Sequence, residues 1–389
     1  MVGYCLAALC ALVIFYFPVQ TAVYTIKGFS ADFIGYNPFI SSIKNNLAVS
    51  RPNFLYPLII ALISAGLQDA FLQTIQLWTT LAFYVLLALT LVWILDRELG
   101  LASRPMQVVS RLALVVAMMI FAPINFLPIR NGNLYFGYVG VTVYHNANIA
   151  LLKPLALLHF YLLVDYLRTP DAGMKRSSMV LLPLLLVLAT LAKPNYAMIL
   201  LPTIVVYAVA KMLSRQRIPW KQLLVFVVFP GLLVLAWQYA FQYGSPQLNP
   251  EHTSVVFWPL AAYRLHSLDL APKLLLSIVF PLVAALLLRR GLRHDLFMQL
   301  ALVLTLFGLL FTYCFAETGI RLRDMNFAWC GQIALFLLMV SCVVWTSRWY
   351  LREGRVGWRL AIVSGAFLMH VVGGIFWYYR ETFSSGQFW

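Results

Sequence analysis

A single carboxylate, Asp32, lies in the sequence ADFIGYNPF, directly after the first long apolar stretch of the chain. None of the eleven residues that follow it is basic. A carboxylate in this position can accept a proton from an attacking hydroxyl group, or it can hold a divalent cation such as Mg²⁺ or Mn²⁺. It is equally compatible with a solvated loop residue or a helix N-cap. Tyr36 would share the face of Asp32 in a helix and could help to shape a sugar site.

Two lysines lie in otherwise apolar sequence, Lys153 in HNANIALLKPLAL and Lys193 in LAKPNYAMILLP. A lysine at membrane depth costs a few kcal/mol unless it reaches water or a partner. Lys153 would lie about two turns below His145 and Asn146, on a helix that enters from the outside. The two ammonium groups could together receive an anion such as a lipid phosphate. The alternative is that each one extends to the headgroups.

Two arginines, Arg321 and Arg323, alternate with apolar residues in ETGIRLRDMNF. In an extended segment both guanidinium groups would point the same way, and such a pair suits the oxygens of a lipid phosphate or a diphosphate leaving group. The alternative is that Glu317 and Asp324 neutralise them. Arg51, in the first outer loop, belongs to the same set of polar residues on the outer side.

Familiar motifs for nucleotide or metal chemistry are missing from the sequence. It contains no Walker loop, GxGxxG motif or HExxH motif, which argues against energy coupling to a cytoplasmic nucleotide. The five cysteines lie in or at the ends of apolar runs, so we interpret them as small hydrophobic residues rather than as metal ligands or a disulfide framework.

The composition predicts an all-α polytopic membrane protein. Of 389 residues 62% are hydrophobic and only 11% are charged, with a mean hydropathy of +0.84. A soluble fold of this length could not cover its surface with so few charges. At roughly 20 to 25 residues per crossing, the chain accommodates about eleven transmembrane helices in a single domain, residues 1–389, with no separate soluble domain.

The distribution of positive charge predicts the orientation. The net charge is +15, and about seventeen of the 28 basic residues fall in five short loops, at residues 97–111, 168–176, 211–221, 289–293 and 348–359. Basic residues concentrate in cytoplasmic loops of membrane proteins. The N-terminus is therefore expected in the cytoplasm and the C-terminus outside, and the charge is explained by the bilayer without a nucleic-acid partner.

Apolar periodicity places the helices. The first apolar stretch, Gly3 to Val23, lacks the leading basic segment and cleavage site of a secretory signal and is expected to remain as helix 1. Lys27 to Gln68 forms a long outer loop with two interfacial helices, one at Pro38 to Ala48 and one at Phe54 to Ala65, the second too short to cross. The later helices are expected at residues 71–95, 106–127, 149–167, 179–210 (a hairpin that turns at Lys193), 223–242, 274–288 and 297–313, followed by two more.

The layout resembles the GT-C superfamily of membrane glycosyltransferases, which use polyprenyl-phosphate-linked sugars. The resembling features are the acidic Asp32 soon after helix 1, the long first outer loop, and RPNFLYPLIIAL at residues 51–62, which is similar to an apolar segment of many members. YHNANIALLKPLAL and LAKPNYAMILLP resemble segments of bacterial GT-C-like proteins. The chain departs from the pattern in having one acid in the first loop, where many members have a pair, and Arg51 where histidine is common.

The resemblance implies that Asp32 is the catalytic base of an inverting sugar transfer on the extracytoplasmic side of a bacterial inner membrane. It also implies that Arg321, Arg323, Lys153 and Lys193 hold the carrier phosphate, with a glycan, lipid or protein as acceptor. Two alternatives remain open: an O-antigen polymerase or ligase, and a transporter or flippase of a lipid-linked glycan. A transporter more often shows repeated halves and broken helices near the midplane, and the sequence shows no repeat.

The predicted topology can be tested with single cysteines, introduced into a chain that lacks its five native ones. A membrane-impermeant thiol reagent added to intact cells should label a cysteine at Gln68 and not one at Arg97, because the basic loop that holds Arg97 is expected in the cytoplasm. Equal labelling of the two positions from outside would overturn the orientation.

Overall fold

The computed structural model describes residues 2–24, 31–46, 49, 51–100, 105–127, 137–170, 173–244 and 252–383. Within these residues the chain forms a bundle of helices and one two-stranded antiparallel sheet. Nine helical segments of the described part are long and apolar enough to cross a membrane. The chain is therefore a polytopic helical membrane protein, as its composition predicts.

These nine long apolar segments are α1 (Val2–Tyr24), α4 (Leu72–Leu99, preceded by the turn η2, Asp69–Phe71), α6 (Ala147–Arg168), α8 (Asn195–Leu213), the continuous run of α9 (Trp220–Leu223), η4 (Leu224–Val228) and α10 (Phe229–Gly244), α12 (Leu270–Leu287), α14 (Leu296–Cys314), α15 (Ala328–Glu353, preceded by the turn η5, Gly319–Asp324) and α16 (Trp358–Phe383). The shorter helices are α2 (Ala31–Asn46), α3 (Leu55–Ile63), α5 (Pro105–Ile120), α7 (Arg176–Ala192), α11 (Ala261–Arg264) and α13 (Arg289–Leu292).

Two of the eleven expected crossings are not among the nine long apolar segments of the described residues. The helix expected at residues 106–127 ends at Ile120, because Pro123 follows and the chain there bonds to α16 instead of continuing. Helix α7 has 17 residues, about 25 Å, which is less than the roughly 30 Å of a bilayer core. The hairpin does turn at Lys193 as predicted, and α3 has only nine residues, so the apolar run at Phe54 to Ala65 does not span.

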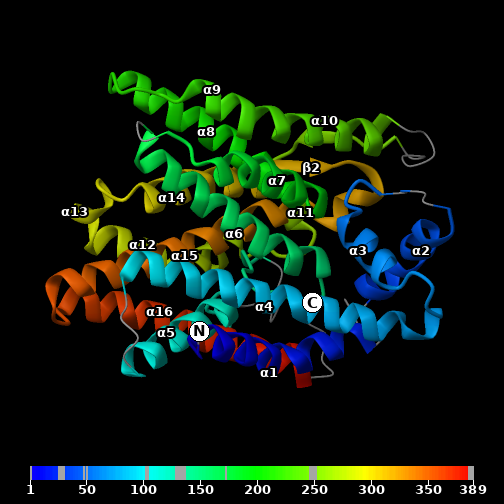
Figure 1. The fold of residues 1–389 in the computed structure, drawn as a ribbon, viewed down its shortest axis with the longest axis horizontal. Coiled ribbons are helices and arrows are strands. Elements are labelled where there is room, and N and C mark those ends of the chain that lie inside the picture. The colour runs from blue at the N-terminus through cyan, green and yellow to red at the C-terminus, as the bar shows by residue number, and fades with distance from the viewer. Residues whose placement is uncertain are drawn as a thin grey trace.

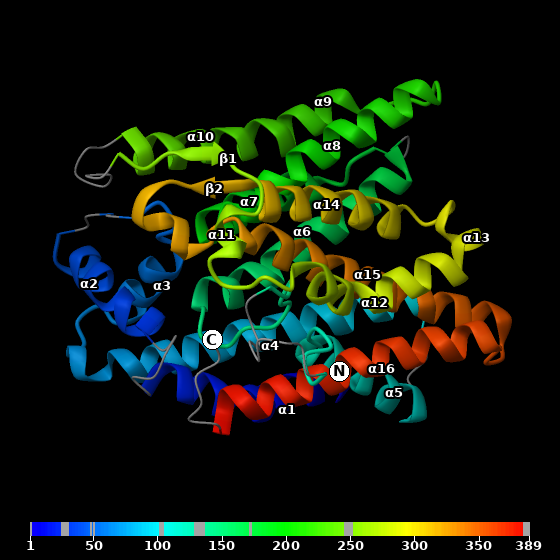
Figure 2. The same cartoon turned by 180° about the vertical axis from the view of Figure 1, so that it is seen from behind.

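The bundle has two distinct ends. Figure 1 shows the long helices running side by side along the long axis, with α9 and α13 at one end and α2 and α3 at the other. We call the first the basic end, because the loops rich in arginine and lysine lie there, and the second the loop end, which also bears the sheet of β1 (Val255–Phe257) and β2 (Phe315–Glu317) (Figure 2).

Helix α15 is the centre of the bundle. Nearly all of its residues from Ala328 to Trp345 are buried. It packs closely against α14, because a Cβ atom on Gly308 would meet Ala334 at 2.5 Å. Thr312 of α14 joins the two helices further, since its hydroxyl accepts a bond from the Gly331 amide (2.8 Å). Small residues and hydroxyl groups are the usual means of close helix packing in membranes.

An irregular stretch of chain lies inside the bundle. Residues 121–125 and 137–146 are buried yet not helical. Non-helical backbone at membrane depth needs partners from the protein, since no water is available. Here α12, α16 and the segment itself supply them: Ala122 N to His370 O (3.1 Å), His370 Nδ1 to Ala122 O (2.8 Å), Ile124 N to Leu276 O (3.1 Å), Val139 N to Ser277 Oγ (3.0 Å) and Thr142 Oγ1 to Phe121 O (2.8 Å).

A network of charged side chains closes the basic end. Glu98 of α4 accepts bonds from Arg168 (2.5 Å) and Tyr161 (2.8 Å) of α6 and pairs with Arg348 of α15 (3.0 Å). Arg348 also contacts Asp295, the N-cap of α14, at 2.5 Å. The side chains of Glu98 and Asp295 are 5% and 7% exposed. Arg348 therefore joins two buried carboxylates from different helices.

Replacing Arg348 by glutamine is expected to destabilise the protein by about 3 kcal/mol, because breaking a buried ion pair leaves a carboxylate without its countercharge. Unfolding in mixed micelles measures the loss. Arg352→Gln, on the exposed final turn of the same helix, is the matched control and should change little. Equal loss in both variants would mean that the network contributes nothing.

Candidate functional site

Glu317 is the centre of a polar cluster at the loop end. It is the last residue of β2, which pairs with β1 in the register Val255 to Glu317. The strand leads directly out of α14, so the carboxylate lies just beyond the end of that helix. The residue is buried, with 4% of its surface exposed. A buried carboxylate requires partners, and three side chains supply them.

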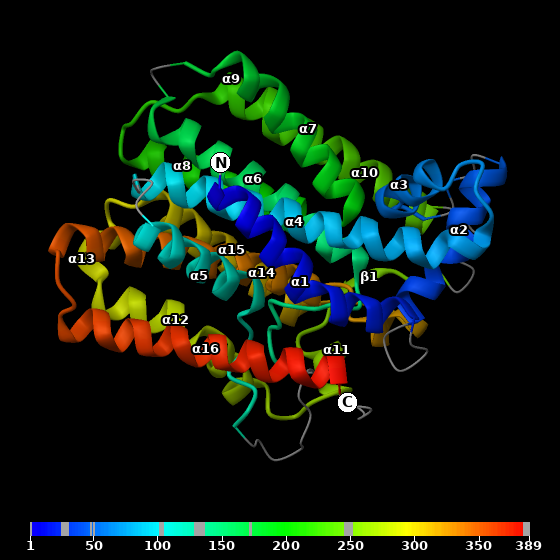
Figure 3. The same cartoon turned by 60° about the horizontal axis from the view of Figure 1, so that its bottom comes forward.

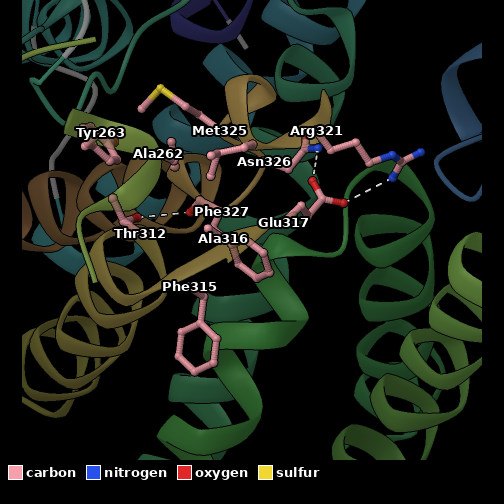
Figure 4. Close-up of a pocket in the computed structure, with 12 residues that line it drawn as sticks. Ala262, Tyr263, Thr312, Phe315, Ala316, Glu317, Arg321, Met325, Asn326 and Phe327 are labelled. Carbon is pink, nitrogen blue, oxygen red and sulfur yellow. Dashed lines mark hydrogen bonds and ion pairs between the residues drawn. The ribbon is translucent and has the colours of Figure 1, made fainter. Parts of the chain in front are cut away.

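The Glu317 carboxylate accepts three hydrogen bonds. Figure 4 shows it between Arg321 and Asn326, whose side chains donate over 3.2 Å and 2.5 Å. The hydroxyl of Tyr243, at the end of α10, donates over 2.5 Å to the oxygen that Arg321 also contacts. An ionised carboxylate has about four acceptor positions. Glu317 therefore holds α10, η5 and the start of α15 together, and it orients the Arg321 guanidinium.

An apolar pocket adjoins this cluster. Figure 4 shows its lining residues, which come from α11, the end of α14, β2, η5 and the start of α15. The ring of Tyr263 in α11 lies tilted against that of Tyr313, with ring centroids 5.0 Å apart. Burial lowers the pKa of the neighbouring His266 below its usual value, so that imidazole is neutral at pH 7. Arg321 is then the cation of this pocket.

Lys193 lies next to the Glu317 cluster. It ends α7 in extended backbone, it is buried, and its ammonium lies 3.9 Å from the ring centroid of Trp329 on α15. Asn195, at the start of α8, donates to Asn326 O (2.9 Å) and contacts Cys330 Sγ (3.1 Å). Asn326 thus connects the turn of the short hairpin to Glu317.

The first-loop helix α3 packs against the short hairpin. Gln238 of α10 donates both to Thr190 O in α7 (2.9 Å) and to Pro52 O, just before α3 (3.0 Å). Leu55 and Tyr56 of α3 are buried. The segment from residue 51 to 62 therefore lies among α4, α6, α7 and α10.

Lys153 lies deeper in the bundle. It is buried, and its ammonium lies 5.1 Å from the ring centroid of Phe336. Within the described part of the chain no ion pair joins it to a carboxylate. Phe336 and Trp329 are seven residues apart on α15, a rise of about 10 Å. The two lysines thus contact the same helix, each at its own aromatic ring.

A second polar cluster joins the first loop to the start of α6. The Tyr36 hydroxyl of α2 accepts a bond from Asn148 (2.8 Å), and its ring lies 5.2 Å from that of Tyr56. Asn146 caps α6 by accepting from the Ile149 amide (3.1 Å). The adjacent His145 lies 3.7 Å from Glu381 near the end of α16. This cluster fixes α2 against the second loop.

Several sequence predictions change in the structure. Arg321 and Arg323 do not point the same way, because η5 is a tight helical turn rather than an extended segment: Arg321 pairs with Glu317, whereas Arg323 is exposed. Arg51 is exposed and stacks on Phe39 (3.7 Å). Asp32 belongs to α2, but its side chain lies outside the described residues.

A metal site is not formed by the residues that the structure describes. Among them no group of three or more histidine, cysteine, aspartate or glutamate side chains gathers that could hold an ion. The prediction that Asp32 holds a divalent cation falls on a side chain outside this part. It stays a prediction.

Sequence reasoning missed the partners that complete these clusters, which are Tyr243, Asn195, Asn326 and Glu381. It also missed a third buried lysine, Lys273. Lys273 is wholly buried in α12, where it donates to Ser267 (3.1 Å) and lies 5.3 Å from the Tyr138 ring centroid. Like Lys153 and Lys193, Lys273 lies next to a proline in an apolar run. The argument that a lysine in apolar sequence needs a partner would therefore have singled it out as well.

The fold thus defines a polytopic helical membrane protein with a buried polar cluster at one end of its bundle. Searches with this chain find no matching protein-family model and no similar curated protein.

Replacing Glu317 by alanine is expected to destabilise the loop end, because the part-buried donors of Tyr243 and Arg321 and the exposed Asn326 amide lose their shared acceptor, at a cost of about 0.5–1.5 kcal/mol for each hydrogen bond. Glu317→Gln keeps one acceptor oxygen, so its stability should lie between that of the unmodified chain and that of Glu317→Ala. Thermal melting in detergent measures both. The control is Glu353→Ala at the exposed end of α15. If Glu317→Ala melts at the same temperature as this control, the cluster does not stabilise the protein.

Proposed function

We propose that the chain is a membrane glycosyltransferase that transfers a sugar from a polyprenyl-phosphate-linked donor to an extracytoplasmic acceptor, with inversion. The observation that carries the proposal is the gathering of two cations, Arg321 and Lys193, around one buried polar cluster at the loop end of an apolar bundle. A lipid-linked phosphate presents its charge at such a depth while its chain remains in the bilayer.

The reaction is a displacement at the anomeric carbon. The acceptor hydroxyl attacks that carbon and passes its proton to the carboxylate of Asp32. The bond from the anomeric carbon to the phosphate oxygen breaks, and polyprenyl phosphate leaves with the electron pair. Arg321 and Lys193 stabilise the charge that grows on the leaving group. Lys153, deeper in the bundle, attracts the same anion from within.

The position of α2 supports the role of Asp32. Asp32 precedes Tyr36 by one helical turn, and Tyr36 is anchored to Asn148 at the start of α6. The backbone of the proposed base is therefore held against the second loop. In this proposal the loop end faces outward and the basic end faces the cytoplasm of a bacterium, in accordance with the distribution of basic residues.

One observation favours a second candidate, a transporter or flippase of a lipid-linked glycan. At mid-length the backbone of helix α12 bonds to neighbouring segments: Leu276 O accepts from Ile124, and the Phe280 amide donates to His370 Nε2 (3.3 Å). Irregular backbone that is buried between helices occurs in transporters. A transporter moves its substrate without forming a glycosidic bond, so product analysis separates the two functions.

The base is tested with Asp32→Asn, which should lower transfer roughly 10²- to 10⁴-fold because a general base contributes about that factor. The assay uses purified protein in lipid, a panel of radiolabelled polyprenyl-phosphate sugars and extracted cell-envelope acceptors, scored for new glycoconjugate and released polyprenyl phosphate. Asp69→Asn, an exposed carboxylate that pairs with Lys44 at the same end, is the control. Near-normal transfer by Asp32→Asn would refute the mechanism.

The leaving-group contacts are tested with Arg321→Lys, which keeps the charge and loses the planar fork. Because the contact strengthens in the transition state, turnover of bound donor should fall more than donor affinity. If no donor yields product and the lipid-linked sugar instead equilibrates across the leaflets of proteoliposomes, the chain is a transporter.

A further inference from the structure

A cavity lies at the basic end, away from the polar cluster of the loop end. It has a volume of about 180 Å³ and is formed where α12 ends, α13 turns, and α15 leads into α16. Figures 2 and 3 show α13 next to the turn between α15 and α16 at this end. Three arginines and two tryptophans line it together with two leucines of α12.

The arginines give the cavity one sign of charge. Arg289 and Arg290 come from α13 and Arg359 from the first turn of α16. In the part of the chain that the structure describes, no ion pair joins any of the three to a carboxylate. The nearby Arg348, by contrast, is satisfied by Glu98 and Asp295. A concave surface lined by one sign of charge concentrates counter-ions of the opposite sign.

The remaining walls suit the boundary of a membrane. Trp349 and Trp358 line the cavity, and Trp358 is 64% exposed. Tryptophan is enriched where hydrocarbon meets headgroups. Leu286, 64% exposed, adds an apolar surface on α12. A cavity lined by both cations and apolar side chains matches a molecule with an anionic headgroup and an acyl chain.

The shape of the cavity is set by close packing. A Cβ atom on Gly291 would lie 3.1 Å from the Trp349 ring and 3.2 Å from Trp345 Nε1. The turn of α13 therefore packs directly on α15, which brings Arg289 and Arg290 to the same cavity as Trp349. The arginines are held by a rigid turn rather than by a long loop.

We propose that this cavity binds an anionic phospholipid, with the headgroup phosphate among Arg289, Arg290 and Arg359 and an acyl chain along Leu286 and the tryptophans. Guanidinium groups bind phosphate oxygens bidentately. Basic pockets between transmembrane helices recognise acidic lipid headgroups. The site is separate from the proposed sugar transfer, and it attaches α12, α15 and α16 to the leaflet on the basic side.

The test titrates the detergent-purified full chain with dioleoyl phosphatidylglycerol and follows the rise in melting temperature, with native mass spectrometry counting retained lipid. Dioleoyl phosphatidylcholine, which has the same chains and no net charge, should have little effect. The variant Arg290→Gln/Arg359→Gln should bind phosphatidylglycerol about 25-fold more weakly, at about fivefold for each basic residue removed.

The matched control is Arg293→Gln/Arg352→Gln, which removes the same charge from exposed positions outside the cavity lining and should bind like the unmodified chain. The proposal is overturned if the two double variants weaken binding equally, if phosphatidylcholine stabilises as well as phosphatidylglycerol, or if soluble glycerol phosphate at matched ionic strength displaces the lipid. Should the cavity variant fail to fold, Arg359→Gln alone carries the same test with a fivefold effect expected.

Discussion

The absence of water from the bilayer core is the constraint on which the rest of this structure depends. Every backbone group that leaves a helix inside the bundle needs a partner from the protein. Buried polar side chains meet this need: His370, Ser277 and Thr142 bond the irregular segments. Gln238 bonds Thr190 O near the turn of the short hairpin, and Asn195 bonds Asn326 O before α15. These buried polar residues therefore have a structural role, which is to bond irregular backbone. A catalytic role for any of them requires separate evidence.

Charge is arranged differently at the two ends of the bundle. At the basic end, carboxylates and arginines from four helices neutralise one another around Glu98 and Arg348. Toward the loop end, three buried lysines lie against aromatic rings: Lys153 on Phe336, Lys193 on Trp329 and Lys273 on Tyr138. A ring face attracts a cation without neutralising it. These three side chains are the basic groups that the proposed carrier phosphate would meet from the loop end.

The hairpin of α7 and α8 connects the first-loop helix α3 to the polar cluster around Glu317. The turn at Lys193 is buried, and Gln238 of α10 bridges Thr190 beside that turn to Pro52 before α3. Asn195 then ties the turn to Asn326 and so to Glu317 and Arg321. Residues more than a hundred positions apart in sequence form one cluster because the turn between α7 and α8 lies beside the chain that enters α15.

The sequence alone determined the class of protein, most helix positions, the turn at Lys193 and the non-spanning segment before Gly66, since apolar length and proline act locally. It also singled out Glu317, Lys153 and Lys193, because a charged residue close to apolar sequence needs a partner whatever the fold. It did not determine the partners Tyr243, Asn195 and Asn326, nor that Arg321 and Arg323 diverge. Those depend on the tight turn of η5 and on contacts between distant helices. Which side chains meet is set by the packing angles and lengths of whole helices, and no local pattern of residues encodes that.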